Sequence, residues 1–174
     1  MQITTLPLAK TSEARERLLR TASGIFYTEG INSTGVDHIV SAANVTRATF
    51  YRHFPSKTDL VLAYLQAAHD AIDAHLTDTT VEGLTADVCT QIQRPEFRGC
   101  AFICAAAEFE DPEHPVRRAV AAHREWYLGV VRDAFGSDDA ARHFVMLRDG
   151  AFVGADLGDP ELAARTFLRA AGAP

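Results

Sequence analysis

Residues 34–60 read TGVDHIVSAANVTRATFYRHFPSKTDL, and this stretch decides the fold. It contains two short segments whose apolar residues recur at helical spacing, the first including Ile39 and the second including Phe50 and Phe54. Asn44 lies at the short join between them, and asparagine tolerates the left-handed backbone that a tight turn between helices requires. The stretch therefore predicts two short helices held at a fixed angle.

The second segment, Thr46–Lys57, has the side chains that a DNA-reading helix needs. Such a helix must be short, fixed by a neighbour, and rich in groups that reach phosphates and base edges. Thr46 suits the N-cap and a phosphate bond, while Arg47 and Thr49 fall in the first turn, which meets base edges. Lys57 stands at the start of the next helix, and helix N-termini attract phosphate.

The other polar residues of this segment suit the DNA backbone. Tyr51 and His53 are placed for phosphate contact, and Arg52 suits either a phosphate or a base. For Arg47, a bidentate contact to guanine and a simple phosphate pair both remain open. A solvated face over a core stripe is the ordinary interpretation of such residues. The coincidence of a cap, a turn and local positive charge favours DNA contact instead.

Residues 12–60 resemble the DNA-binding domain of the TetR/AcrR family of transcriptional regulators, with Tyr51, His53-Phe54 and Lys57-x-x-Leu60 as the most specific elements. Where the family turn usually reads Ala-Gly-Val, this chain has Asn44 in place of the glycine. The resemblance implies a phosphate contact by Thr34 at the start of the second helix. It also implies DNA contacts by Thr46, Arg47, Thr49, Tyr51, Arg52, His53 and Lys57.

The charge distribution agrees with a DNA-contacting N-terminal part. The chain has 174 residues and a net charge of −6, but residues 1–60 hold seven Lys and Arg against five Asp and Glu. Residues 61–174 hold ten against eighteen, so the remainder is acidic. No apolar run is long enough for a membrane helix, no signal pattern opens the chain, and three cysteines form no disulfide framework. We expect a cytoplasmic protein without membrane contact.

The rest of the chain also predicts helices, so the expected fold class is all-α. A first helix is expected over about residues 12–28 and a long one over about 57–76. Pro115 suits a first helical position, Ser137 an N-cap, and Asp159-Pro160 a cap followed by a first-position proline. We expect a helix-turn-helix DNA-binding domain over residues 1–56 and a helical-bundle ligand-binding and dimerisation domain over residues 57–174.

The C-terminal part contains candidates for a ligand pocket. Residues 99–116, GCAFICAAAEFEDPEHPV, resemble a segment common in one branch of the family, which implies the usual ligand-binding and dimerisation domain. Because ligand pockets are mostly apolar with a few polar groups, Phe102, Cys104, His123 and Tyr127 are the candidate lining. Cys100 and Cys104 lie one helical turn apart, which leaves a redox or metal sensor open beside core or pocket lining.

Small residues recur near the C-terminus at helical spacing. Gly150, Gly154 and Gly158 are four residues apart, beside Ala151 and Ala155. Glycine costs a helix about 1 kcal/mol relative to alanine, so a close helix approach is expected in return. The interface of a homodimer, formed by Gly150, Ala151, Gly154 and Ala155, and packing within one chain are both open.

These patterns predict a dimeric regulator that binds double-stranded palindromic operator DNA and leaves it when a small-molecule effector binds. The family resemblance implies that it is a repressor. The alternative is a helical ligand-binding protein or enzyme that has lost DNA binding. The sequence has no Gly-rich phosphate loop, no His-Glu-x-x-His and no Gly-x-Ser-x-Gly, so we expect neither an enzyme nor a cofactor or metal site.

Overall fold

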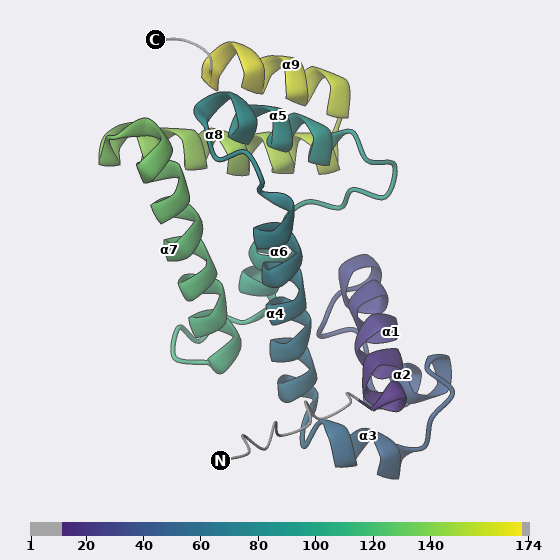
Figure 1. The fold of residues 1–174 in the computed structure, drawn as a ribbon. Helices are drawn as coiled ribbons and strands as arrows, with labels where there is room; N and C mark the ends of the chain where they lie inside the picture. Colours follow the sequence, from purple (N-terminus) through teal and green to yellow (C-terminus); the bar gives the residue numbers. More distant parts are fainter. Residues whose placement is uncertain (1–11, 172–174) are drawn as a thin grey trace, which may run out of the picture. The chain divides into compact units, whose positions relative to one another are not determined.

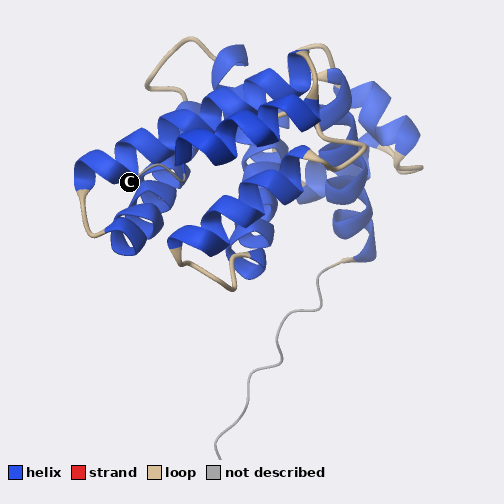
Figure 2. Ribbon diagram, turned by 90° about the horizontal axis from the view of Figure 1, so that it is seen from above, coloured by secondary structure: helices blue, strands red, loops and turns tan. Residues whose placement is uncertain are grey.

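The computed structural model describes residues 12–171, and within that range every regular element is an α-helix (Figures 1 and 2). The predicted all-α fold class is therefore confirmed. The helices are α1 (Glu13–Glu29), α2 (Val36–Ala42), α3 (Arg47–His53), α4 (Lys57–His75), α5 (Val81–Ile92), α6 (Ala101–Glu108), α7 (Pro115–Phe135), α8 (Asp138–Leu157) and α9 (Pro160–Ala171). None of these helices is both long and apolar enough to span a membrane.

Backbone contacts divide the chain into two compact units, Met1–Leu60 and Val61–Pro174. The division falls inside α4, four residues after the boundary expected from the sequence. The first unit contains α1 to α3 and the first turn of α4, and the second contains the rest of α4 and the other helices. The domain boundary at residue 56 stays a prediction.

The turn between α2 and α3 is built around Asn44. Asn44 has φ 51°, the left-handed conformation expected from its residue type. Its N–H donates to the Ser41 carbonyl, and the Val45 N–H donates to the Val40 carbonyl at 3.0 Å, which is the Schellman pattern of helix endings. The Arg17 side chain of α1 donates to the Ala43 carbonyl at 2.9 Å, so α1 is tied to this turn. This geometry fixes where α3 begins.

A side-chain cap marks the start of α3, a proline follows its end, and a second side-chain cap marks the start of α4. The Thr46 hydroxyl accepts a hydrogen bond from the Thr49 N–H at 3.1 Å, which confirms the predicted N-cap. Phe54 has an extended backbone before Pro55, as the residue preceding a proline prefers. Ser56 then accepts from the Asp59 N–H at 3.1 Å in the first turn of α4. The core of this unit includes Leu18, Phe26, Ile39, Phe50 and Phe54.

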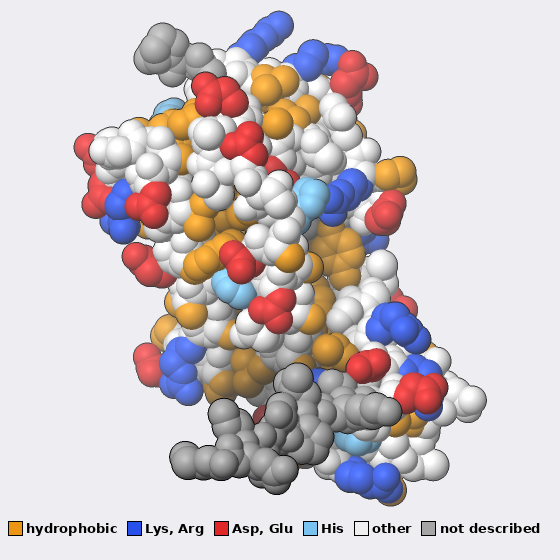
Figure 3. All heavy atoms as spheres, in the orientation of Figure 1, with side chains coloured by type: hydrophobic (Ala, Val, Ile, Leu, Met, Phe, Trp, Pro, Cys, Tyr) orange, Lys and Arg blue, Asp and Glu red, His pale blue; other side chains and the backbone are white. Residues whose placement is uncertain are grey.

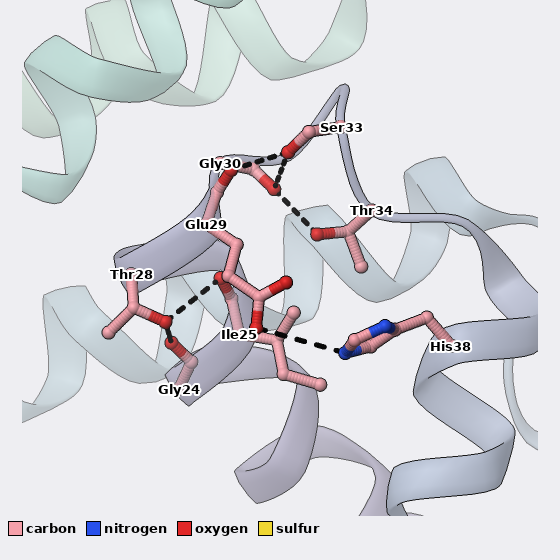
Figure 4. A network of polar contacts seen from close by, with 8 residues as sticks. All are labelled: Gly24, Ile25, Thr28, Glu29, Gly30, Ser33, Thr34 and His38. Carbon is pink, nitrogen blue, oxygen red and sulfur yellow. Dashed lines mark hydrogen bonds and ion pairs between the residues drawn. The ribbon is translucent and has the colours of Figure 1, made fainter.

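The chain between α1 and α2 forms a compact hydrogen-bonded turn (Figure 4). The Thr34 hydroxyl donates to the Gly30 carbonyl at 2.7 Å, and the Ser33 hydroxyl contacts the carbonyls of Glu29 and Gly30. The Glu29 carboxylate lies 3.8 Å from the His38 ring nitrogen on α2. These bonds satisfy the last carbonyls of α1 and set the position of α2.

In the second unit, α8 packs along α9, and α5 lies against both, while α6 and α8 pack on α7 (Figure 1). The predicted helix starts are confirmed. Pro115 is the first residue of α7, and Ser137 caps α8 by accepting from the Ala140 N–H. Asp159 accepts from the N–H groups of Glu161 and Leu162 at the start of α9. These helices bury a core with Phe102, Phe144, Phe152 and Phe167.

Candidate functional site

The outer face of α3 carries most of the predicted DNA-contacting residues. Thr46, Arg47, Tyr51 and Arg52 are exposed, and Thr49 is half-buried. Phe50 on the opposite face is fully buried and contacts the Tyr51 ring edge-on, with ring centroids 5.1 Å apart. Burial of one face holds the helix in place, so the other face is presented to solvent in a fixed orientation. In Figure 3, Lys and Arg side chains stand at the lower edge of this unit, where Figure 1 shows α3.

Arg47 is held by a partner that the sequence did not indicate. Its guanidinium forms two hydrogen bonds of 2.5 Å to the carboxylate of Asp37 on α2. The hydrogen bond and the charge of Arg47 lower the pKa of the Asp37 carboxyl, so the aspartate stays ionised. Asp37 therefore occupies the planar edge of the Arg47 guanidinium that would otherwise donate to a guanine edge or a phosphate. Any DNA contact by Arg47 must therefore replace Asp37 or be shared with it.

Thr34 differs from the other predicted DNA contacts because it is buried. Its residue is only 2% exposed, and its hydroxyl is used by the Gly30 carbonyl within the α1–α2 turn (Figure 4). The helix α2 begins at Val36, two residues later than the sequence suggested. The Thr34 hydroxyl thus helps to shape the turn, and its phosphate contact stays a prediction.

His53 and Lys57 flank the end of α3. His53 is half-buried, and its Nε2 lies 3.4 Å from the Ser12 hydroxyl at the start of α1. Lys57 is half-buried at the N-terminus of α4. All seven α3-segment positions that resemble family DNA contacts are thus exposed or half-buried. Their individual roles toward DNA stay predictions.

The structure brings three of the four predicted pocket residues together between α6, α7 and α8. Phe102 stacks on His123 with ring centroids 3.5 Å apart, and both line a small cavity with Tyr127. Cys104 does not join them, because it is exposed and its thiol faces the Arg98 carbonyl. The cavity holds Cys100 instead, which is buried.

Arg148 of α8 supplies the charge in this cavity. The residue is 5% exposed, and its guanidinium lies over the rings of Tyr127 and Phe152 at 4.7 and 4.3 Å. It also donates to Asp149 at 2.9 Å and lies 4.0 Å from the Cys100 sulfur. Burial acts to lower the pKa of Arg148, but these neighbours more than offset it, so the guanidinium stays charged.

His123 is neutral in this setting. Burial, together with the nearby His69, Arg148 and Arg124, lowers the pKa of His123 from 6.5 to about 3. Its Nδ1 lies 3.0 Å from Nδ1 of His69 on α4, so the two rings share one hydrogen bond. Since the unshifted ring of an unfolded chain takes up a proton near pH 6.5, His123 links the stability of this unit to pH.

This link gives a testable pH dependence. Because the folded pKa of His123 is depressed, its stabilising contribution is complete above about pH 6.5 and is lost as the pH falls toward 3. We expect the free energy of unfolding to drop between pH 7 and 5, with a His123 contribution of at most about 1.4 kcal/mol per pH unit. His123→Phe is expected to flatten that slope in urea unfolding at pH 5, 6 and 7. If the free energy of unfolding has the same slope against pH in both proteins, His123 is not the group that causes the pH dependence.

A larger cavity lies on the other side of the Phe102–His123 pair. It has a volume of about 350 Å³ and lies between α4, α6 and α7. Its lining is apolar and aromatic apart from a glutamine and two histidines: Leu62, Leu65, Gln66, His69, Phe102, Ala119, Ala122, His123 and Trp126. The Trp126 ring contacts His69 at 4.5 Å between centroids. A cavity of this size and lining suits a small planar molecule.

An apolar groove of about 490 Å³ runs between α8 and α9. It is lined by Gly150, Ala151 and Gly154, three of the four small residues predicted for a dimer interface. Ala155 is buried within its own chain. A Cβ added at Gly154 would lie 3.8 Å from the Cβ of Ala163 on α9, whereas one at Gly150 would meet nothing within 4 Å. Gly154 thus faces α9 within the same chain, at a distance that would also accept an alanine, and Gly150 faces open space.

Comparison with known proteins identifies the family. The family model described as bacterial regulatory proteins, tetR family, matches residues 18–64. The structure of SCO4454, a TetR-family transcriptional regulator from Streptomyces coelicolor, is 47% identical in sequence and superposes with a TM-score of 0.88. The aligned region covers 93% of this chain and 94% of that one. The chain belongs to the TetR family.

Other relatives of this TetR-family chain agree on the fold and differ in the sign of regulation. A putative regulator from Streptomyces avermitilis is 26% identical, with a TM-score of 0.78, over 94% of this chain and all of that one. The probable acrEF/envCD operon repressor of Escherichia coli K12 is 34% identical over 98 residues, and the activator FasR of Mycolicibacterium smegmatis 43% over 54. The matches span 55% and 31% of this chain, but only 43% and 25% of those two proteins.

Sequence reasoning missed two residues of the sites in this TetR-family chain, Asp37 and Arg148. Asp37 lies in the first turn of a helix, where acidic residues are common, and Arg148 stands between Leu147 and Asp149 in no recognisable motif. The i, i+4 positions of Phe144, Arg148 and Phe152 on one buried face of α8 are the signal that would have found Arg148. Within residues 12–171, no three His, Cys, Asp or Glu side chains lie close enough to hold a metal ion.

Proposed function

We propose that this chain is a dimeric, ligand-responsive repressor that reads a palindromic operator through α3 of each copy. The observation that carries the proposal is the outer face of α3, where Arg47, Tyr51 and Arg52 are exposed while Phe50 is buried. A short helix fixed on its inner face and basic on its outer face fits the major groove of DNA. In a symmetric dimer, two such helices about 34–36 Å apart meet successive major grooves of one operator.

The groove between α8 and α9 supports the proposed homodimer. Met146 and Leu162 line it and are 74% and 55% exposed, and Leu157 on α8 is 80% exposed. Large apolar side chains gathered on one exposed face mark an interaction surface. A two-fold axis over this face would pack α8 and α9 against the same helices of a second copy. TetR-family regulators act as dimers, and this groove is our candidate for the contact.

Ligand response requires that the effector prefer one conformation of the protein. An effector that binds the DNA-free state more tightly shifts the population by the ratio of its two affinities. The candidate effector site is the pair of cavities on either side of Phe102 and His123. Repression is the proposed sign, although named relatives include both a probable repressor and an activator.

A gel-shift and footprinting experiment tests the function. The full-length protein is mixed with the DNA upstream of its own gene and of its neighbours, at two salt concentrations. A protected palindrome supports the proposal, and so does a reporter gene behind it that is expressed less when the protein is present. A folded dimer that protects no site would favour the alternative of a helical ligand-binding protein or enzyme that has lost DNA binding.

Lys57 is expected to act on the DNA backbone rather than on bases. Lys57→Ala should weaken binding to operator and to unrelated DNA by the same factor, because a phosphate contact carries no sequence information. It should also reduce the slope of log affinity against log salt by about 1 per subunit, since fewer counterions are released. Fluorescence anisotropy at four salt concentrations measures both. Equal salt slopes for the variant and the wild type would remove Lys57 from the interface.

A further inference from the structure

The two cavities beside Phe102 and His123 differ in character. The outer cavity, of about 350 Å³, is apolar and aromatic and has room for a small ring system. The inner cavity, between α6, α7 and α8, measures about 10 Å³ and holds Tyr127 and Arg148. The stacked rings of Phe102 and His123, parallel within 3°, line both cavities. A molecule in the outer cavity is therefore separated from the inner polar groups only by this stack.

The described residues that line the inner cavity contribute two guanidinium groups, those of Arg124 and Arg148, and no carboxylate. Asp149 is the carboxylate paired with Arg148, but its other oxygen lies 2.8 Å from Arg124. One carboxylate is thus shared by two guanidinium groups. The nearby Asp87 of α5 is engaged elsewhere, with His75 at 3.2 Å and Gln91 at 2.5 Å. A buried guanidinium that shares its carboxylate with a second guanidinium favours the entry of an anion.

Tyr127 adds an unused hydrogen-bond donor to the same cavity. Tyr127 is 5% exposed, and within residues 12–171 no protein group makes a hydrogen bond to its hydroxyl. The Arg148 guanidinium has only donors and therefore acts on the Tyr127 oxygen as a cation or donor, which leaves the proton of the hydroxyl without an acceptor. Burial raises the pKa of Tyr127 to about 12, so the hydroxyl keeps its proton and can donate it to an acceptor. Buried hydroxyls are normally satisfied, so an unsatisfied one beside a cation indicates a ligand position.

We propose that the effector is a planar, apolar molecule with one acidic group, whose rings occupy the outer cavity and whose anionic oxygens are bound by Tyr127 and Arg148. This inference rests on the proposed function, because it takes the cavities as the effector site. The rings would stack on Trp126 and Phe102, which line the outer cavity. The anion would receive the Tyr127 hydroxyl and one edge of the Arg148 guanidinium.

Binding of this kind requires the Phe102–His123 stack to move. A cavity of about 10 Å³ is at the lower limit for a single water molecule, roughly 10–15 Å³, and is too small for a carboxylate. The acidic group therefore enters by displacing His123. Because His123 is hydrogen-bonded to His69, its movement breaks a contact with α4, the helix that begins at Lys57. An acid that reaches Arg148 thus changes the packing of α4, whereas a neutral ring in the outer cavity does not.

The test compares matched ligands that differ only in charge. Isothermal titration calorimetry is carried out on the full-length protein with benzoate, 2-naphthoate and 2-anthroate. Each acid is paired with its primary amide and with the corresponding arylmethylammonium ion. We expect at least one acid to bind ten times more tightly than its amide, and the ammonium ion to bind weakest. Tyr127→Phe and Arg148→Met should each reduce the acid-over-amide ratio at least fivefold.

Three variants make the result interpretable. Tyr127→Phe removes a hydroxyl without a hydrogen-bond partner, so its melting temperature should stay within a few degrees of the wild type even if Arg148→Met fails to fold. Arg132→Met removes a positive charge from the same helix as Tyr127, beside Glu125 and Asp138, and should leave the ratio unchanged. Binding of the amides or ammonium ions as tightly as the acids would overturn the proposal.

Two further outcomes would also overturn it: unchanged acid preference in Tyr127→Phe, or no binding by any of the three acids. The calorimetry contains no DNA, so its failure leaves operator binding untouched. Failure of the footprinting experiment would in turn leave the ligand preference standing. The two proposals therefore fail separately.

Discussion

Met146→Arg combined with Leu162→Arg is expected to convert the protein to a monomer and to weaken operator binding by at least about 100-fold. Both side chains line the groove between α8 and α9 and are more than half exposed in the single chain. In the proposed dimer they would be buried, and each arginine would bring an unpaired charge into an apolar contact. In a dimer, binding of one recognition helix holds the second close to its half-site. A monomer loses this advantage, which raises operator affinity by a factor of roughly 10²–10⁴.

Sedimentation equilibrium at micromolar protein measures the oligomeric state, and fluorescence anisotropy measures operator affinity. The matched control is Leu168→Arg, because Leu168 is an exposed leucine of α9, 47% accessible, that does not line the groove. The control should remain a dimer with wild-type affinity. A double variant that stays dimeric would move the dimer contact to another surface. A monomer with unchanged operator affinity would contradict the paired reading of the DNA.

The helix-turn-helix was predictable because its signals are local. Asn44 adopts the left-handed conformation, Thr46 caps α3, and Ser56 caps α4, each through contacts within about five residues along the chain. Helix caps and tight turns depend on residue types that are neighbours in the sequence, so they can be predicted from it. The same holds for the starts of α7, α8 and α9, where a proline or a capping side chain marks the first turn.

The chemistry of the ligand pocket was only partly predictable, because its partners are distant in sequence. The residue types of Tyr127 and His123 predict polar members of an apolar pocket, and both are buried at the cavity. Arg148 comes from the following helix, and its contact with Cys100 joins residues 48 positions apart. The periodicity of α8 places Arg148 on its buried face, but it does not show which distant residue the guanidinium meets.

Cys104 shows how spacing misleads at a helix end. Cys100 and Cys104 are four residues apart, which places two residues on one face when both are helical. Cys100 is instead the N-cap of α6, with φ −87° and ψ 121°. Its extended backbone turns the thiol toward Arg148, while Cys104 in the helix proper stays exposed. The sequence pattern identified the pair, but the position of the helix start decided which thiol is buried.

Arg47→Ala is expected to lower operator affinity by about 1–3 kcal/mol, a factor of roughly 5–150, and to relax base preference at one position in each half-site. Arg47 is exposed at the first turn of α3, where a recognition helix meets base edges. Quantitative footprinting on the operator and on single-base variants measures both effects. An unchanged order of preference among these sites would show that Arg47 is not the residue that reads the base.

Asp37 limits how much Arg47 can contribute to the free energy of operator binding. In the free protein Asp37 holds the Arg47 guanidinium through two hydrogen bonds, so DNA must compete with a carboxylate. Asp37→Ala removes that competitor, and because Arg47 is expected to read a base, it should tighten binding to the operator more than binding to unrelated DNA. The gain should disappear in the Asp37→Ala/Arg47→Ala double variant, because it acts through the freed arginine. If Asp37→Ala tightens binding equally with and without Arg47, the effect is general charge repulsion and the pair does not regulate the contact.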